Sequence, residues 1–228
     1  LTIDAIGIPR SLRQGVERRL AESAQLRPEQ FVIVASHTHS GPEFRAGRVP
    51  ESDPNGVATS RAYLEMLEQT LTALAVEGLA ALTPAKVAYT RARAGFAMNR
   101  RLPQPNGDFT NAPNPDGPVD HDVPVLRVES DQGQLRGVVF GYAGHTSTLL
   151  SDNYRFSGDY AGFAQEWLEQ QHPDTVAFFV QGCGGDIMAS PRGTVELARQ
   201  YGETLGTRAA KVLGGPMRPV RGRLKCAF

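Results

Sequence analysis

The stretch FVIVASHTHSGPEF, residues 31–44, starts as an apolar run and ends in two histidines one residue apart. Residues 31–36 are apolar and rich in β-branched side chains over the length of a strand, which predicts a buried strand. Downstream, leucines recur at helical spacing over 61–84, which predicts a long amphipathic helix that ends at Pro84. A strand that alternates with helices in this way is typical of an α/β fold.

The rest of the chain extends this pattern. Further strands are predicted at 1–6, 86–94, 123–130, 135–143 and 175–182, and further helices at 11–24, 158–171 and 195–213. Ser11 is the expected N-cap of the first helix. A DQG turn joins two of the strands as a hairpin, so the sheet is mixed. Residues 104–120, rich in Pro, Asn, Asp and Gly, are predicted to form a long exposed loop.

These elements predict one α/β domain over residues 1–228, in which a mixed β-sheet is flanked by helices in three layers. Strand, polar loop, helix, proline and strand occur twice, from Phe31 and from Thr175, so an internal repeat is a further hypothesis. The chain starts and stops within what read as strands. We therefore expect a domain truncated at one or both ends.

Composition excludes several classes of function. Lysine plus arginine equals aspartate plus glutamate at 24 each, so no global field favours nucleic acid. No run reaches the roughly 18 to 20 apolar residues that span a bilayer. We expect a soluble chain with no transmembrane segment, and its localisation stays open, with export of a longer precursor as one alternative. The two cysteines, Cys183 and Cys226, form no disulfide framework, and their pairing is left open.

Histidines stand at two predicted strand ends. In a strand, residues two apart project to the same side, so His37 and His39 are expected to reach a common point. His145 follows another apolar strand, and ligands of α/β sheets collect at such carboxyl ends. Neutral imidazole suits a borderline metal such as zinc. We predict a metal site with His37 and His145 as ligands. The alternative is that His39 only hydrogen-bonds the loop around Gly41 and Pro42.

Carboxylates occur at comparable places. Asp4 ends the first predicted strand, Asp159 begins the helix at 158–171, and Asp186 closes the loop QGCGGD. Asp186 or Asp159 is predicted as a general base, and Asp4 or one of these as a further metal ligand. Asp159 has an alternative reading as a residue that favours a helix N-terminus.

Three further features bear on substrate binding. Arg100 and Arg101 are expected to hold a carboxylate or phosphate, or to be a solvated pair. The amides of Gly184 and Gly185 are predicted to face an oxyanion, although the loop has neither the P-loop lysine nor a dinucleotide fingerprint. Cys183 in the same loop is predicted to be a small buried residue rather than a nucleophile.

Five motifs share their order and similar intervals with one known family. They are SHTHSGP (36–42), NRR (99–101), GHTST (144–148), SGDYAG (157–162) and FVQGCGGD (179–186). With them, the chain resembles the amino-terminal catalytic part of the neutral, non-lysosomal ceramidases and their bacterial relatives. The resemblance implies a zinc-dependent hydrolase, which in the best-known members cleaves the amide bond of ceramide.

Carried over to this sequence, the resemblance implies that His37 and His145 bind zinc and that His39 and Arg100 contact the reacting group or the substrate. The family completes its zinc shell with a glutamate and a tyrosine from a region carboxyl-terminal to these motifs. This chain ends before that region.

Ile187 and Met188 follow the GD of the glycine loop, where ceramidases carry a serine. We therefore expect a broader amidase or esterase, in which water activated by zinc to a pKa of about 7 attacks a small-molecule or lipid-like substrate. The predicted catalytic residues are His39, Arg100, Asp186 and Asp159. A second hypothesis is a noncatalytic binding module or an incomplete domain. A third is that the open edges of an unfinished sheet are covered in a homo-oligomer, which completes the site.

Overall fold

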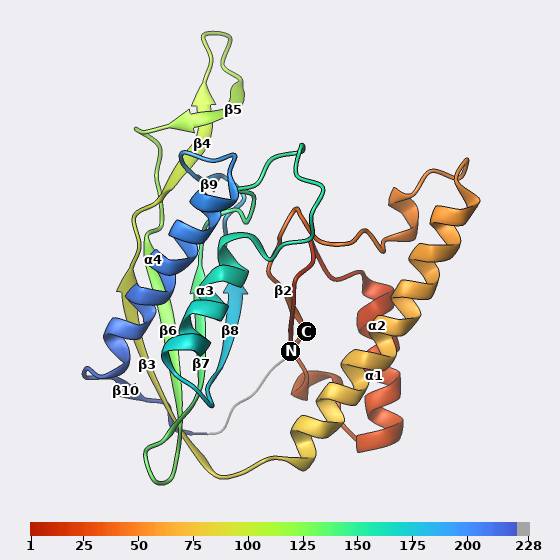
Figure 1. The fold of residues 1–228 in the computed structure, drawn as a ribbon, viewed down its shortest axis with the longest axis vertical. Coiled ribbons are helices and arrows are strands. Elements are labelled where there is room, and N and C mark those ends of the chain that lie inside the picture. The colour runs from red at the N-terminus through yellow and green to blue at the C-terminus, as the bar shows by residue number, and fades with distance from the viewer. Residues whose placement is uncertain (223–228) are drawn as a thin grey trace.

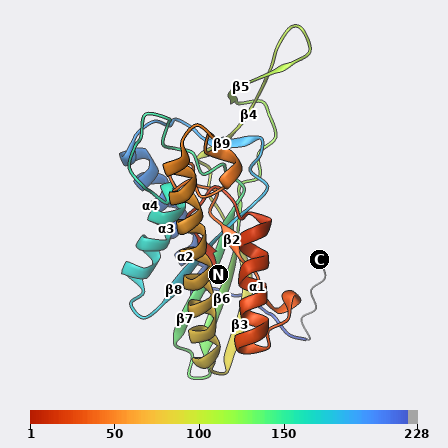
Figure 2. The ribbon, with the colours of Figure 1, turned by 90° about the vertical axis from the view of Figure 1, so that its right-hand side faces the viewer.

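The computed structural model describes residues 1–222 and shows a mixed α/β architecture (Figures 1 and 2). The helices are α1 (Arg10–Ala24), α2 (Pro54–Ala80), α3 (Asp159–Gln171) and α4 (Val195–Leu213), with short 3-10 helices at Pro28–Gln30 and Ala46–Arg48. The strands are β1 (Thr2–Ile3), β2 (Val34–Ala35), β3 (Ala85–Arg93), β4 (Ala97–Pro103), β5 (Phe109–Asn114), β6 (Asp122–Ser130), β7 (Leu135–Tyr142), β8 (Val176–Gln181), β9 (Ile187–Ala189) and β10 (Arg218–Pro219).

The main sheet has five strands in the order β10-β3-β6-β7-β8. β7 and β8 are parallel and are connected through α3, whereas the other neighbours are antiparallel. Helices α3 and α4 pack against each other and cover one face of this sheet (Figure 1). The first hydrophobic cluster lies between them, and its large, fully buried members include Tyr142, Tyr160, Phe140, Phe179, Leu168 and Leu205.

A smaller unit is built from the amino-terminal residues. β1 and β2 form a parallel pair beside β8, and α1 and α2 pack against each other over this pair (Figure 2). The second hydrophobic cluster fills the space between them and includes Leu12, Val16, Leu20, Phe31, Phe44, Leu67 and Leu71. Apolar residues at helical spacing in both helices provide this interface.

The predicted fold class, a mixed α/β fold flanked by helices, is confirmed, and the strands divide into three sheets. The two amino-terminal strands are two residues long rather than the six predicted for each. Their pairing ends early because the backbone turns into the left-handed region at His37, with φ of 62°. The internal repeat stays a prediction.

Two helix starts differ from the prediction. α1 begins at Arg10 after an extended Pro9, and it has no side-chain cap, so the prediction of Ser11 as N-cap is wrong. α2 begins at Pro54 rather than at 61, because Asp53 caps it by accepting a hydrogen bond from the Gly56 N–H at 2.9 Å. A proline at the first helical position supports this start, since its missing N–H would be unpaired there.

The prediction of a structureless loop over 104–120 is also wrong. β5 pairs with β4 to form a hairpin that projects from the body of the protein, and β4 pairs with β9 on its other side (Figure 1). The hairpin turns at Gln104–Asp108, where Gly107 has a φ of 86°. β5 is polar and largely exposed, so it lacks the apolar alternation by which strands are recognised. No helix in the described residues is long and apolar enough to cross a membrane.

Candidate metal centre

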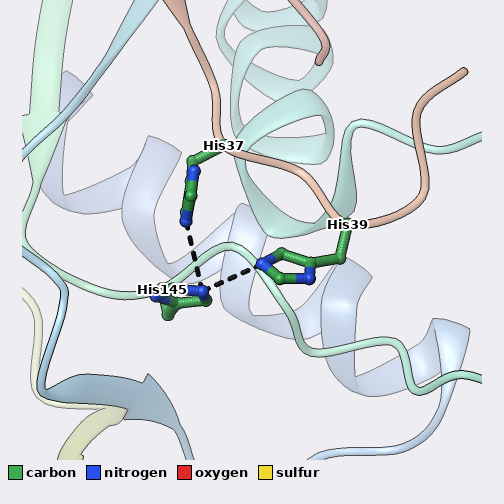
Figure 3. A group of neighbouring side chains, drawn as sticks. All are labelled: His37, His39 and His145. Atoms are coloured by element: carbon green, nitrogen blue, oxygen red, sulfur yellow. Dashed lines mark hydrogen bonds between the residues drawn. The ribbon is translucent and has the colours of Figure 1, made fainter. Parts of the chain in front are cut away.

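Three imidazoles from two distant segments converge on one point (Figure 3). The Nε2 atom of His145 lies 3.2 Å from Nε2 of His37 and 2.9 Å from Nε2 of His39. One ligand nitrogen from each ring lies within 4.8 Å of the other two. His37 and His145 are partly buried, whereas His39 is exposed, so the group opens to solvent on the His39 side.

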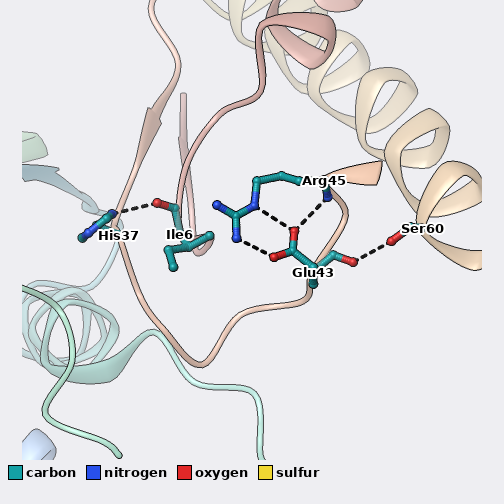
Figure 4. Close-up of polar contacts among 5 residues, drawn as sticks. All are labelled: Ile6, His37, Glu43, Arg45 and Ser60. Atoms are coloured by element: carbon teal, nitrogen blue, oxygen red, sulfur yellow. Dashed lines mark hydrogen bonds and ion pairs between the residues drawn. The ribbon is translucent and has the colours of Figure 1, made fainter. Parts of the chain in front are cut away.

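His37 and His39 reach this point by a turn rather than by strand geometry. β2 ends at Ala35, and the left-handed backbone of His37 sets its ring at 90° to the ring of His39. The Nδ1 atom of His37 lies 2.7 Å from the carbonyl oxygen of Ile6 (Figure 4). The backbone N–H of His39 donates to the carbonyl oxygen of Thr146 at 3.2 Å, which joins the two histidine segments.

The loop that follows His39 is anchored to α2 (Figure 4). The hydroxyl of Ser60 donates to the carbonyl oxygen of Glu43 at 2.9 Å. The Glu43 carboxylate in turn accepts from Nε of Arg45 at 2.8 Å. Because this carboxylate is engaged by arginine, it serves to hold the loop.

His145 is fixed through the residues on either side of it. Its backbone N–H donates to the carbonyl oxygen of Ile187 at 2.9 Å. The carbonyl oxygen of Gly144 accepts from the buried Tyr160 hydroxyl and, at 3.0 Å, from Nε2 of Gln181. Sequence reasoning missed Tyr160 and Gln181 as positioning residues, although both lie inside the motifs SGDYAG and FVQGCGGD.

The protonation states of two rings follow from their acceptors. Nδ1 of His145 lies 3.1 Å from the carbonyl oxygen of Gly184, and Nδ1 of His37 faces the carbonyl oxygen of Ile6. A carbonyl oxygen only accepts, so each Nδ1 carries the proton and each neutral ring has its lone pair on Nε2. These two lone pairs face each other across 3.2 Å, which is repulsive unless a cation lies between them.

The spacing fits a metal ion. Imidazole nitrogens at about 2.0 to 2.1 Å from a tetrahedral zinc ion lie about 3.3 Å apart. The observed Nε2 separations of 3.2 and 2.9 Å are close to this value. In each of His37 and His145, the second ring nitrogen faces a backbone carbonyl, which is the arrangement that orients ligating histidines.

Electrostatics favour the neutral form of the ligands. Burial, followed by the charge of Arg100, lowers the pKa of His145 to about 4. Burial, followed by the charge of His37, also lowers the pKa of His39. Neutral imidazole is the form that binds metal, so the ligands are ready near neutral pH.

Arg100 lies beside His145, with Nη2 3.2 Å from Nδ1 of that ring. The Nδ1 atom carries a proton, so Arg100 donates to the carbonyl oxygen of Gly185 instead, at 2.9 Å. Arg101 donates to the same oxygen, also at 2.9 Å. In the part of the chain that the structure describes, neither arginine forms an ion pair with a carboxylate.

The predicted base Asp159 is buried and holds backbone. Its carboxylate accepts from the N–H of Leu149 at 2.9 Å and from the N–H of Tyr160 at 2.7 Å. It therefore links the segment after His145 to the first turn of α3, close to its alternative reading as a helix N-terminal residue.

The other two predicted carboxylates also lie outside the group of three histidines, within residues 1–222. Asp186 approaches Nδ2 of Asn99 at 3.4 Å, and its backbone carbonyl accepts from the N–H of Arg100. Asp4 lines a separate cavity of about 380 Å³ and packs against Gly158.

The glycine loop presents carbonyl oxygens to the site. The N–H of Gly184 is donated to the carbonyl oxygen of Gly182 at 2.8 Å, so in this arrangement it is not available to an oxyanion. The carbonyl oxygens of Gly184 and Gly185 face His145 and the two arginines. The prediction that Cys183 is buried is wrong: its thiol is free and exposed, because this loop turns outward. Cys226 lies outside the described residues.

Known proteins provide one kind of match. No family model matches the chain, and no curated protein matches it. Among solved structures, neutral ceramidase from Pseudomonas aeruginosa superposes with a TM-score of 0.75 over 98% of this chain, at 19% sequence identity. The chain has the neutral ceramidase fold. A ceramidase in complex with C2 matches with a TM-score of 0.74 over 98% of this chain, at 20% identity.

The match confirms, at the level of fold, the resemblance to ceramidases inferred from the five motifs. The chain spans 38% and 37% of the length of the two ceramidases. In this ceramidase fold, His39 and His145 open onto a cavity of about 470 Å³. Arg100 also lines the cavity, together with the apolar side chains of Leu149 and Leu150. The histidine cluster thus lies where a small organic molecule can reach it.

Proposed function

We propose that the protein is a zinc-dependent hydrolase of amide or ester bonds, with His37, His39 and His145 as the metal-binding residues. The observation that carries this proposal is the meeting of Nε2 lone pairs from His37 and His145 at 3.2 Å, with His39 at 2.9 Å. A hydrolase also agrees with the ceramidase fold, although the fold alone assigns no activity.

A bound zinc ion would lower the pKa of a water molecule to about 7 and so supply a hydroxide nucleophile. Arg100, which faces the same cavity as His39, is placed to stabilise negative charge on the carbonyl oxygen of a substrate. Of the two predicted bases, Asp186 is favoured as proton acceptor. Its carboxylate has one long contact of 3.4 Å, whereas both oxygens of Asp159 already accept backbone N–H groups.

The substrate is proposed to be small or lipid-like. The cavity combines Leu149 and Leu150 with the polar groups of the site, which suits an apolar chain joined to a polar head. Both matching structures are named as ceramidases. In this chain Met188, two residues after the GD, is buried in β9, so we propose a broader amidase or esterase activity than theirs.

The alternative is a noncatalytic binding module or an incomplete domain, favoured by the share of 38% of the ceramidase length that the chain covers. A homo-oligomer that completes the site is a third proposal. A solution mass of one chain would exclude it.

Elemental analysis of protein purified without chelator tests the proposal. We expect about one zinc per chain in the parent, none in His37→Ala or His145→Ala, and full content in the control His121→Ala, whose ring lies outside the cluster. Turnover of ester and amide substrates should be lost in EDTA and restored by zinc. A parent without metal and without EDTA-sensitive turnover would instead support the binding module.

A further inference from the structure

A second guanidinium shares the cavity of the histidine cluster. Arg192, which follows β9, lines the cavity of about 470 Å³ together with His39, His145 and Arg100. Its side chain is partly buried. Within residues 1–222 it forms no hydrogen bond or ion pair with the protein, unlike Arg100, which donates to Gly185.

The two guanidinium groups are close enough to repel each other. Burial lowers the pKa of Arg100, and the charges of Arg101 and Arg192 lower it further. Asp186 opposes this effect least among these causes. Among the described residues that line the cavity, none is a carboxylate. The cavity is therefore a positively charged recess.

Such an arrangement is costly in the free protein, because like charges that are partly removed from water are poorly compensated. An anion that enters between the two groups recovers this cost. Guanidinium pairs with carboxylate through two parallel hydrogen bonds, which gives direction as well as strength. Arg192 has all of its N–H groups available for this purpose, whereas Arg100 is partly occupied by Gly185.

We propose that this cavity binds the carboxylate of an amide-linked substrate, an N-acyl amino acid, and that Arg192 is the residue that determines this specificity. The proposal rests on the proposed hydrolase function for its reaction. Leu149 and Leu150 on the cavity wall receive the acyl chain, and His39 lies on the same lining. Hydrolysis adds water across the scissile bond: a C–O bond forms, the C–N bond breaks, and the nitrogen takes a proton. The products are a fatty acid and a free amino acid.

Binding is tested with two ketone isosteres, in which CH₂ replaces the amide NH so that the protein as purified cannot cleave them. One isostere is that of octanoylglycine and ends in a carboxylate. The other is that of octanoylglycinamide and ends in a neutral carboxamide. By calorimetry we expect the parent to bind the carboxylate about tenfold more tightly than the carboxamide, because the pair with Arg192 is charge-assisted.

Variants assign the preference to one side chain. Arg192→Ala should remove the tenfold preference and leave carboxamide binding unchanged, and Arg192→Lys should retain part of it. Arg208→Ala, on the exposed face of α4, is the matched control and should behave as the parent. Equal binding of the two isosteres by the parent would overturn the proposal, as would an equal loss for both in Arg192→Ala.

Kinetics separate this inference from the hydrolase proposal. Octanoate release from octanoylglycine should exceed that from octanoylglycinamide in the parent, and Arg192→Ala should abolish the difference through KM. A carboxylate preference in calorimetry without any turnover supports the anion site and overturns the hydrolase. Turnover of both substrates at equal KM, with equal binding of the isosteres, does the reverse.

Discussion

Gln181 and Thr146 are joined by a hydrogen bond of 2.8 Å, in which the threonine hydroxyl donates to the side-chain oxygen of Gln181. The amide group of the same side chain donates to the carbonyl oxygen of Gly144 at 3.0 Å. Gly144 and Thr146 flank His145 in the chain. One side chain at the end of β8 therefore fixes the backbone on both sides of a proposed metal ligand.

We predict that Gln181→Leu weakens zinc binding about tenfold, since groups that orient metal ligands contribute factors of about 10 to 100 in affinity. Leucine keeps the approximate volume but makes neither hydrogen bond. Competition with a chromophoric chelator measures the affinity, and Gln200→Leu on the exposed face of α4 is the control. Unchanged zinc affinity in a folded Gln181→Leu protein would contradict the positioning role.

Gly184 and Gly185 form a natural matched pair. A Cβ at Gly184 would lie 2.8 Å from the carbonyl carbon of Gly144 and 2.9 Å from the backbone nitrogen of His145, whereas a Cβ at Gly185 meets nothing within 4 Å. We expect Gly184→Ala to lower the free energy of unfolding by about 1 to 3 kcal/mol, as overpacking does. Gly185→Ala should be close to neutral. Urea denaturation compares the two, and equal stabilities would show that the loop relaxes freely.

The stability of the metal-free protein should fall in acid. Burial lowers the pKa of His145 from the ordinary 6.5 to about 4, so between these values the unfolded chain binds a proton that the folded protein does not. The free energy of unfolding therefore decreases as the pH falls through this interval, and this contribution levels off below about pH 4. The lowered pKa of His39 acts with the same sign.

Urea titrations at several pH values, in EDTA, measure this dependence. His145→Gln should flatten the curve between pH 6.5 and 4, and His121→Gln should leave it as in the parent. Parallel curves for the parent and His145→Gln would mean that burial does not hold this ring neutral.

Zinc should raise the melting temperature of the parent, since a ligand at 100 times its Kd adds about 2.7 kcal/mol to the free energy of unfolding. His37→Asn is the sharpest test of the site, because asparagine tolerates the left-handed backbone that His37 adopts, with φ of 62°. We expect this variant to fold and to lose the shift. His121→Asn should keep it, and a full zinc shift in His37→Asn would place the ion elsewhere.

Much of the site could be predicted from the sequence because histidines are rare in this chain and stand directly after apolar runs. The position of His145 after β7 and of His37 after β2 is visible in the pattern of side chains, and so is their approach to each other. The helices followed from apolar spacing, as in α4. These signals are local, and the fold preserves them.

Other features depend on backbone torsions and on partners far along the chain. Asp159 has a φ of 52°, and this turn directs its carboxylate to the N–H groups of Leu149 and Tyr160. No spacing rule distinguishes such a residue from a general base. Arg192 gave no signal in the sequence, since its proximity to Arg100 arises only when β9 pairs with β4.

The proposed metal ligands belong to different hydrophobic clusters. His37 and His39 lie between Phe31 and Phe44 of the second cluster, whereas His145 follows Tyr142 of the first. Beyond β1 and β2, few contacts join α1 and α2 to the main sheet. An ion shared by these histidines would act as a clasp across the seam between two separately packed halves, and the amino-terminal half would gain rigidity from chemistry that its own core does not provide.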